Sequence, residues 1–228
     1  MLDRGLARRA TSEAVGTGLL VAVVVGSGIA AVRLSPDDVG LQLLENSIAT
    51  GAGLIALILA FGPVSGAHFN PVVTLAARWF GDIGTRAAVV YTAAQVIGSS
   101  VGAVIANLMF ELDAVDFSAR TRATGGLWLG ELVATFGLIV VVLGVARSQP
   151  RAAPYAVGGY IAAAYWFTSS TSFANPAVTV ARSLSDTFAG IRPSSIPMFV
   201  LCQLAGGCAA IALWQFLRPE LVASEQHE

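Results

Sequence analysis

Six polar side chains, in two matching sets, stand within otherwise apolar stretches of this sequence. The first set is Glu13, Asn70 and Gln95, and the second is Glu131, Asn175 and Gln203. Each Asn is followed by Pro, in Asn-Pro-Val-Val-Thr and then in Asn-Pro-Ala-Val-Thr. An acid at membrane depth is costly and usually functional, and an amide can both donate and accept hydrogen bonds. These residues could therefore form hydrogen bonds to a passing solute, or the two acids could relay protons.

The remaining residues do not suggest an enzyme or a metal site. No nucleophile with an adjacent base is apparent, so we expect no catalytic residue and no cofactor. Cys202 and Cys208 lie in one apolar run without zinc-ligand spacing and are interpreted as small core residues. His68 has only His227 as a second histidine, which favours a hydrogen-bonding loop residue over a metal ligand. A net charge of −1 gives no reason to expect nucleic acid as a partner.

The elements that must position these side chains are membrane spans. Only 12% of the residues are charged, against about 25% in soluble domains. The charges leave uncharged runs at 14–32, 46–77, 87–110, 152–181 and 193–217, and a shorter run at 132–146. A spanning helix needs about 20 apolar residues, so the two longest runs exceed one span. We interpret each of these as one full span plus a short re-entrant piece, which predicts an all-α membrane protein with six transmembrane helices and two half-helices.

Arginines set the expected orientation. They precede the first span and flank the connections after the second and fourth spans, while the connections after the first and third spans are mainly acidic. The positive-inside rule then places both termini in the cytoplasm of a multi-pass protein of the inner (plasma) membrane. The first apolar run is longer than the core of a signal peptide, which is about 7–15 residues, so we expect it to be retained as a span.

The Glu, Asn-Pro and Gln features occur twice in the same order, which indicates an internal repeat. Each half holds three spans, an odd number, so the second half must lie upside down relative to the first. We expect a first repeat at 1–110, a connecting loop at 111–126 and a second repeat at 127–228.

Each Asn-Pro pair predicts the start of a short helix. Asn is a favoured N-cap and Pro suits the first helical turn, so the half-helices should cover Pro71–Phe80 and Pro176–Leu184. Inverted symmetry would bring their positive N-terminal ends together at the membrane midplane, where Asn70 and Asn175 would donate to a passing oxygen and cations would be repelled.

The stretch Ser65-Gly-Ala-His-Phe-Asn-Pro-Val-Val-Thr74 closely resembles the first signature of the major intrinsic proteins, the aquaporins and glycerol facilitators. Phe173-Ala-Asn-Pro-Ala177 resembles their second Asn-Pro-Ala (NPA) signature, whereas Val72 replaces the usual Ala of the first. The resemblance implies six tilted helices around a pore in each of four protomers. It also implies that Glu13 and Glu131 buttress the re-entrant loops, with Gln95 and Gln203 in similar roles. The implied pore-lining loop residues are Gly66, Ala67, His68, Phe69, Phe173 and Ala174.

The family's constriction is expected at four further positions. Ungapped counting from the asparagines gives Thr50, Ala163, Ser172 and Val178. The family usually has Arg where this chain has Val178, so the resemblance implies a wider constriction without its usual fixed charge. Arg182 lies one helical turn further on and either hangs back toward the constriction or extends to the surface and pairs with Asp186.

These features favour passive diffusion of small uncharged solutes: glycerol, water and metalloid hydroxides. The run from Asn175 to Gly190 resembles bacterial family members associated with arsenic resistance, which implies arsenous acid (arsenite) as a solute. Two alternatives stay open. An ion-coupled secondary transporter would use the two buried acids, and an anion channel would share the topology. The expected partners are the lipid bilayer, neutral solutes and three further copies in a homotetramer.

Overall fold

The computed structural model describes residues 4–218, and every regular element in that range is helical. The long helices are α1 (Arg4–Leu34), α2 (Val39–Ser65), α4 (Thr85–Met109), α5 (Gly125–Ser148), α6 (Ala153–Phe167) and α8 (Ile196–Leu217). The short helices are α3 (Pro71–Trp79), α7 (Pro176–Ala181) and the 3₁₀ turns η1 (Arg182–Leu184) and η2 (Pro193–Ser195). This arrangement confirms the predicted all-α fold with two half-helices.

Five of the helices are long and apolar enough to cross a membrane. The exception is α6, which has 15 residues where a full span was expected. It begins at a proline-containing turn after Gln149, and it ends where Thr168 caps it with an extended backbone. The chain continues from there as the non-helical stretch 168–175, so the fifth apolar crossing is only partly helical.

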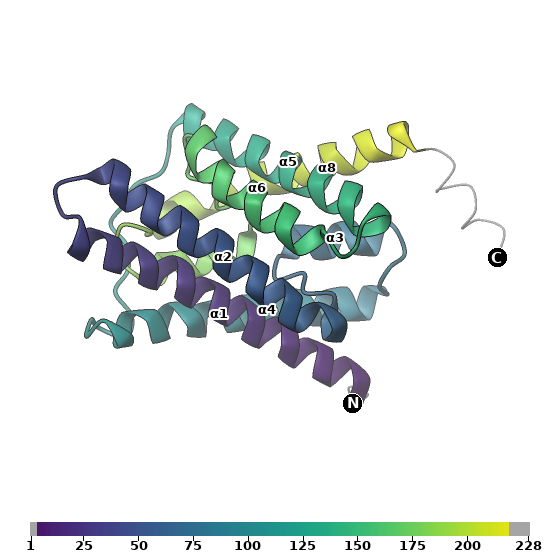
Figure 1. Ribbon diagram of the computed structural model, residues 1–228, viewed down its shortest axis with the longest axis horizontal. Helices are drawn as coiled ribbons and strands as arrows, with labels where there is room; N and C mark the ends of the chain where they lie inside the picture. The colour runs from purple at the N-terminus through teal and green to yellow at the C-terminus, as the bar shows by residue number, and fades with distance from the viewer. Residues whose placement is uncertain (1–3, 219–228) are drawn as a thin grey trace.

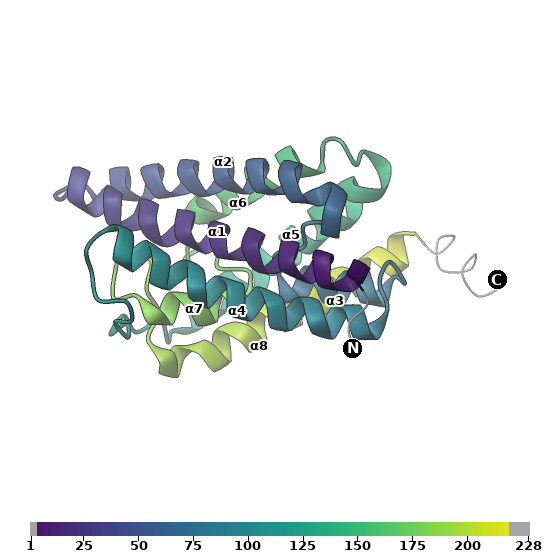
Figure 2. The ribbon, with the colours of Figure 1, turned by 90° about the horizontal axis from the view of Figure 1, so that it is seen from below.

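The six long helices form a bundle around the two half-helices. In the first half α1 packs against α2 and α4, in the second α5 packs against α6 and α8, and contacts between α2 and α6 join the halves. Each half-helix contacts long helices of both halves, since α7 packs against α4 and α8, and α3 packs against α4, α5 and α8. Figures 1 and 2 both place the start of α1 and the end of α8 at the same end of the molecule, as six crossings require.

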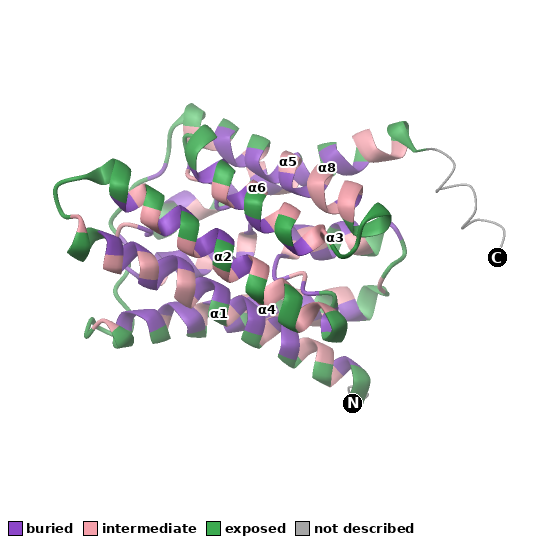
Figure 3. Ribbon diagram, viewed as in Figure 1, coloured by how far each residue is buried: buried purple, intermediate pink, exposed green. Residues whose placement is uncertain are grey.

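The outer faces of the bundle suit lipid. Buried residues face the interior in Figure 3, while large apolar side chains such as Val89, Ile97 and Leu201 lie more than half exposed on the outside. Soluble monomers rarely expose apolar surface on this scale. Together with the long apolar helices, it identifies a multi-pass membrane protein.

Glycines allow α1 and α4 to cross at close range. A Cβ added at Gly98 would collide with the carbonyl oxygen of Ala14, and a Cβ at Gly102 would collide with that of Gly18. Small residues at such crossings let helix backbones approach and pack in lipid. The crossing also brings together two of the polar side chains singled out in the sequence, because α1 carries Glu13 and α4 carries Gln95.

Substituting Gly102 with alanine is expected to lower the free energy of unfolding by about 1–3 kcal/mol, because the added methyl group overlaps backbone that cannot rotate away. Thermal unfolding of the detergent-solubilised protein measures the change. The matched control is Gly159→Ala on α6, where a Cβ meets no atom within 4 Å. The control should be neutral or slightly stabilising, since Ala is the better helix former. Equal loss in both variants would contradict the crossing.

Candidate pore and its constriction

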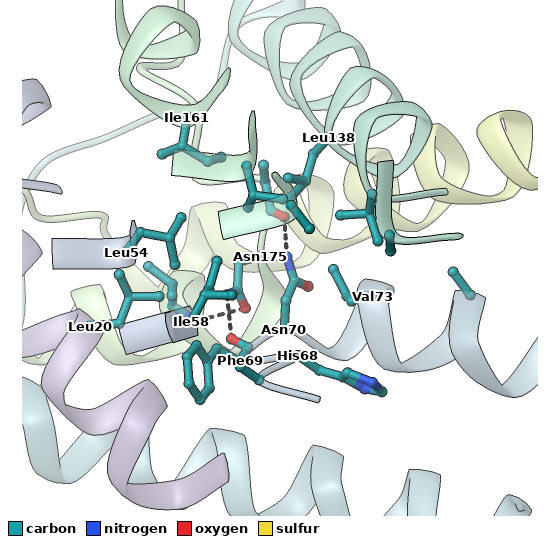
Figure 4. Close-up of a pocket in the computed structure, with 18 of the residues that line it drawn as sticks. Leu20, Leu54, Ile58, His68, Phe69, Asn70, Val73, Leu138, Ile161 and Asn175 are labelled. Atoms are coloured by element: carbon teal, nitrogen blue, oxygen red, sulfur yellow. Dashed lines mark hydrogen bonds between the residues drawn. The ribbon is translucent and has the colours of Figure 1, made fainter. Parts of the chain in front are cut away.

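The two half-helices meet tip to tip at their asparagines. Asn70 Oδ1 accepts from Val72 N at 2.9 Å, and Asn175 Oδ1 accepts from Ala177 N at 3.0 Å, so each side chain caps its own helix. The amide groups cross the contact: Asn70 Nδ2 donates to the carbonyl of Ala174 at 2.7 Å, and Asn175 Nδ2 donates to the carbonyl of Phe69 at 2.8 Å (Figure 4). An amide nitrogen carries two hydrogens, so each Asn keeps one donor beyond this bond.

A cavity of about 220 Å³ surrounds this contact. It is lined by both asparagines, by the loop residues Gly66, Ala67, His68, Phe69, Phe173 and Ala174, and by apolar side chains of the long helices. The two ends of the cavity can be located relative to the half-helices. Asp82 and Arg147 line the cavity beyond the end of α3, and Arg182 lines it beyond the end of α7. The Asp82 and Arg147 side chains pair at 3.2 Å. The cavity therefore runs past both half-helices, with the asparagines between its ends.

Left-handed backbone shapes both loops that approach the asparagines. Ala67 and Phe69 have φ of 49° and 50°, and the corresponding Ser172 and Ala174 have φ of 49° and 48°. Such conformations cost about 1–3 kcal/mol for a non-glycine residue and persist only where the surroundings impose them. In each loop two consecutive N–H groups donate to one carboxylate: those of His68 and Phe69 in the first loop, and those of Phe173 and Ala174 in the second.

Glu13 holds the first of these loops. One carboxylate oxygen accepts from Ser65 Oγ at 2.6 Å and His68 N at 3.0 Å, and the other accepts from Phe69 N and Gln95 Nε2, both at 2.7 Å. Gln95 Nε2 lies 2.9 Å from Thr74 Oγ1 as well, which ties the loop to the half-helix.

Glu131 repeats the arrangement in the second half. Its oxygens accept from Phe173 N at 2.8 Å, Ala174 N at 2.9 Å and Gln203 Nε2 at 2.6 Å, and Gln203 reaches Thr179 Oγ1 at 2.8 Å. Both carboxylates are fully buried, and neither is among the residues that line the cavity. Each carboxylate therefore binds the backbone N–H groups of the loop in its own half and lies outside the cavity lining.

His68 contributes to the cavity through its loop. Its ring points away from the asparagines in Figure 4 and lies edge-on to Tyr91. The Nδ1 atom is 3.1 Å from Thr74 Oγ1. In residues 4–218 no group of three His, Cys, Asp or Glu side chains is arranged to hold a metal ion.

Three of the four positions expected at the constriction line the cavity: Thr50, Ser172 and Val178. The fourth, Ala163, needs correction, because it is exposed on the outside of α6. Ile161 and Tyr165 line the cavity instead, and the Tyr165 hydroxyl is 3.2 Å from Thr50 Oγ1. Ungapped counting was off by two residues, which on an α-helix is a rotation of about 200° to the opposite face. The spacing of Ile161 and Tyr165, four apart in an apolar run, was the available signal.

Arg182 lies inside the protein. Its side chain is 2% exposed and lines the cavity, its guanidinium carbon is 3.4 Å from the centroid of the Phe173 ring, and its Nε donates to the carbonyl of Ala189. Asp186 instead accepts from Ser118 Oγ at 3.2 Å and Ala119 N at 3.0 Å. Of the two sequence-based alternatives, the structure has the inward one.

A second buried arginine, Arg122, was not identified from the sequence. It belongs to the loop between α4 and α5, yet it is only 6% exposed and lies over the same Phe173 ring. Burial, with the positive charges of Arg182 and Arg120, lowers the pKa of Arg122 to about 9. No local signal separates it from the exposed arginines nearby, because its burial depends on packing between distant loops.

Comparison with known proteins agrees with this geometry. The family model described as Major intrinsic protein matches residues 3–170. The chain is 50% identical over 217 residues to Aquaglyceroporin AqpS of Rhizobium meliloti (strain 1021), covering 95% of this chain and 93% of that protein. It is 31% identical to the Probable aquaporin AqpM of Archaeoglobus fulgidus, covering 94% and 98%.

Among solved structures, the fold is similar to the X-ray structure of the aquaglyceroporin from Plasmodium falciparum, with a TM-score of 0.76 and 19% identity over 96% of this chain and 99% of that one. At that identity the match supports the fold alone. The family model and the two sequence relatives go further: this chain belongs to the major intrinsic protein family, whose members are membrane channels and not enzymes.

Proposed function

We propose that this protein is a passive, bidirectional channel for small uncharged solutes, namely water, glycerol and metalloid hydroxides such as arsenous acid. The observation that carries the proposal is the meeting of Asn70 and Asn175 within the cavity. Each presents a spare amide hydrogen beside the positive end of a half-helix. A neutral molecule with oxygen atoms is held by these donors and by loop carbonyls, whereas a cation meets positive potential.

The cavity wall favours solutes larger than water. Apart from the asparagine amides and the loop carbonyls, the wall consists of apolar side chains such as Leu20, Leu54, Leu138 and Ile161. The carbon face of glycerol can lie against such a wall while its hydroxyls reach the asparagine amides and the loop carbonyls. Val178 adds no charge where the family usually has Arg, and the similarity to an aquaglyceroporin supports glycerol. Arsenous acid is neutral at pH 7 and presents hydroxyls in a similar arrangement.

Two other functions remain as alternatives. An ion-coupled transporter needs a titrating or ion-binding acid in the path, and both buried acids are occupied by loop donors. An anion channel is favoured by one observation, the two buried arginines at the α7 end of the cavity. The paired amide donors and mostly apolar wall fit a neutral solute better.

The proposal includes the setting of the channel. Four copies would form a homotetramer in the inner (plasma) membrane, each with its own pore and with both termini in the cytoplasm. The start of α1 and the end of α8 lie at one end of the molecule, in agreement with that orientation (Figure 2). The chain would divide into repeats 1–110 and 127–228 joined by 111–126.

Val178→Arg tests where solutes are selected. The introduced arginine side chain is expected to occupy the cavity beside Arg182 and to lower glycerol permeability at least about tenfold. The effect on water permeability should be smaller, because a narrowed polar opening excludes the larger molecule first. Stopped-flow light scattering on proteoliposomes measures both. The control is Val178→Ala, which removes volume without adding charge and should not lower either rate. Unchanged glycerol-to-water ratios in Val178→Arg would show that the constriction lies elsewhere.

A further inference from the structure

Arg122 belongs to the loop between α4 and α5, yet it is hydrogen-bonded to the stretches before and after α7. Its Nε donates to the carbonyl of Gly190 at 2.9 Å, its Nη1 donates to the carbonyl of Ser170 at 3.2 Å, and its backbone N donates to Ser195 Oγ at 3.1 Å. With 6% of its surface exposed, it is not a solvated loop charge.

Arg122 and Arg182 share their surroundings. Their guanidinium carbons lie 4.9 and 3.4 Å from the centroid of the Phe173 ring, and they bind the consecutive carbonyls of Gly190 and Ala189. The negative ring face and the carbonyls partly offset the two charges. Phe173 lines the cavity, so the ring that both arginines contact is itself part of the cavity wall.

The buried charges around this ring do not balance. Between residues 4 and 218 the ion pair found is Arg147 with Asp82, at the other end of the cavity. The acid buttressing this loop, Glu131, accepts from Phe173 N, Ala174 N and Gln203. Two buried cations therefore face one buried carboxylate, and a net positive charge remains at the α7 end.

The equivalent positions of the first half carry no arginine. In the repeat, His68 corresponds to Phe173 and Ala77 corresponds to Arg182. The excess positive potential is thus confined to the α7 end, where Thr50, Tyr165, Ser172 and Val178 also line the cavity. Buried charges act on a nearby path with little screening by salt.

We propose that Arg122 is a specificity-determining residue of this channel: from behind the wall, its charge adds to that of Arg182 in excluding cations and protons, and its bonds hold the support that both arginines share. This inference rests on the proposed function, since it assumes a solute path past Arg182. It assigns a role in ion exclusion to a loop residue that does not line the cavity.

The test compares Arg122→Gln and Arg122→Lys in proteoliposomes, with proton conductance and glycerol flux measured on the same preparation. Arg122→Gln keeps donors but removes the charge, so proton conductance should rise about tenfold, while glycerol flux stays within about twofold of wild type, within the usual scatter for one altered contact. Arg122→Lys should restore the low proton conductance. Should Arg122→Gln fail to fold, Arg122→Met fills the space without a charge and replaces it in the comparison.

The matched control is Arg120→Gln. Arg120 is in the same loop and also lies over a phenylalanine, Phe188, but it is exposed, so its loss should leave proton conductance unchanged. If vesicles with Arg122→Gln conduct glycerol but keep the low proton conductance of wild type, this inference is overturned and the proposed function still stands. Equal leakage in Arg122→Lys would overturn it too, because the charge would then not be the cause. Wild-type vesicles that pass neither water nor glycerol would instead overturn the proposed function.

Discussion

Replacing Glu131 with leucine is expected to lower the free energy of unfolding by about 3–5 kcal/mol, as removal of one partner from a buried charged network does. Without the carboxylate, the N–H groups of Phe173 and Ala174 and the amide of Gln203 lose their acceptor in a fully buried place. The loop then loses the acceptor that fixes Phe173 and Ala174, and the left-handed conformations of Ser172 and Ala174 keep only the weaker support of the bonds from Ser172 N to Ser170 Oγ and from Asn70 to the Ala174 carbonyl. Thermal unfolding and size-exclusion chromatography in detergent measure the loss.

Two variants control for this result. Glu131→Gln retains one acceptor oxygen and should lose less stability than the leucine variant. Asp37→Ala removes an acid that is exposed in the loop between α1 and α2, and it should have no effect. A Glu131→Leu protein as stable as wild type would mean that the carboxylate does not impose the loop conformation.

Asn70→Asp is expected to convert the centre of the pore into a cation site. The carboxylate can still accept from Val72 N, so the half-helix keeps its cap. It cannot donate to the carbonyl of Ala174, and it brings a negative charge to the point where both half-helix dipoles are positive. We expect sodium conductance to rise about a hundredfold, since one unit charge within a few ångströms of the path changes an ion's energy by a few kcal/mol. Electrical recording from planar bilayers measures it.

Asn46→Asp provides the matched comparison. Asn46 is also buried, donates to the carbonyl of Val24, and is not among the cavity-lining residues. Its replacement should reduce stability without admitting sodium. If the sodium conductance of Asn70→Asp is as low as that of wild type, the asparagine contact does not control the passage of ions.

Local chemistry explains why much of the candidate pore could be predicted from the sequence. Asn followed by Pro marks the start of a helix, because Asn caps it and Pro has no N–H to lose there. In the structure α3 covers Pro71–Trp79 and α7 with η1 covers Pro176–Leu184, within a residue of the expected bounds. Duplication of the pattern then gave the inverted arrangement without knowledge of any tertiary contact.

Features that depend on packing could not be predicted in this way. Which face of α6 meets the cavity depends on the number of residues between that face and Asn175. Ungapped counting therefore selected Ala163, whereas Tyr165 lines the cavity. The length of α6 depends on where the chain leaves the helix at Thr168. Arg122 is buried only because its loop packs against the stretch that follows α7, a contact between residues far apart in the chain.

The most direct test of the account is the time course of glycerol and arsenous acid uptake into proteoliposomes, with and without an imposed proton or sodium gradient. A channel built on the Asn70–Asn175 contact predicts that internal concentrations rise only to the external level and that the gradients change neither the rate nor the end point. Accumulation above the external concentration, driven by either gradient, would contradict passive diffusion.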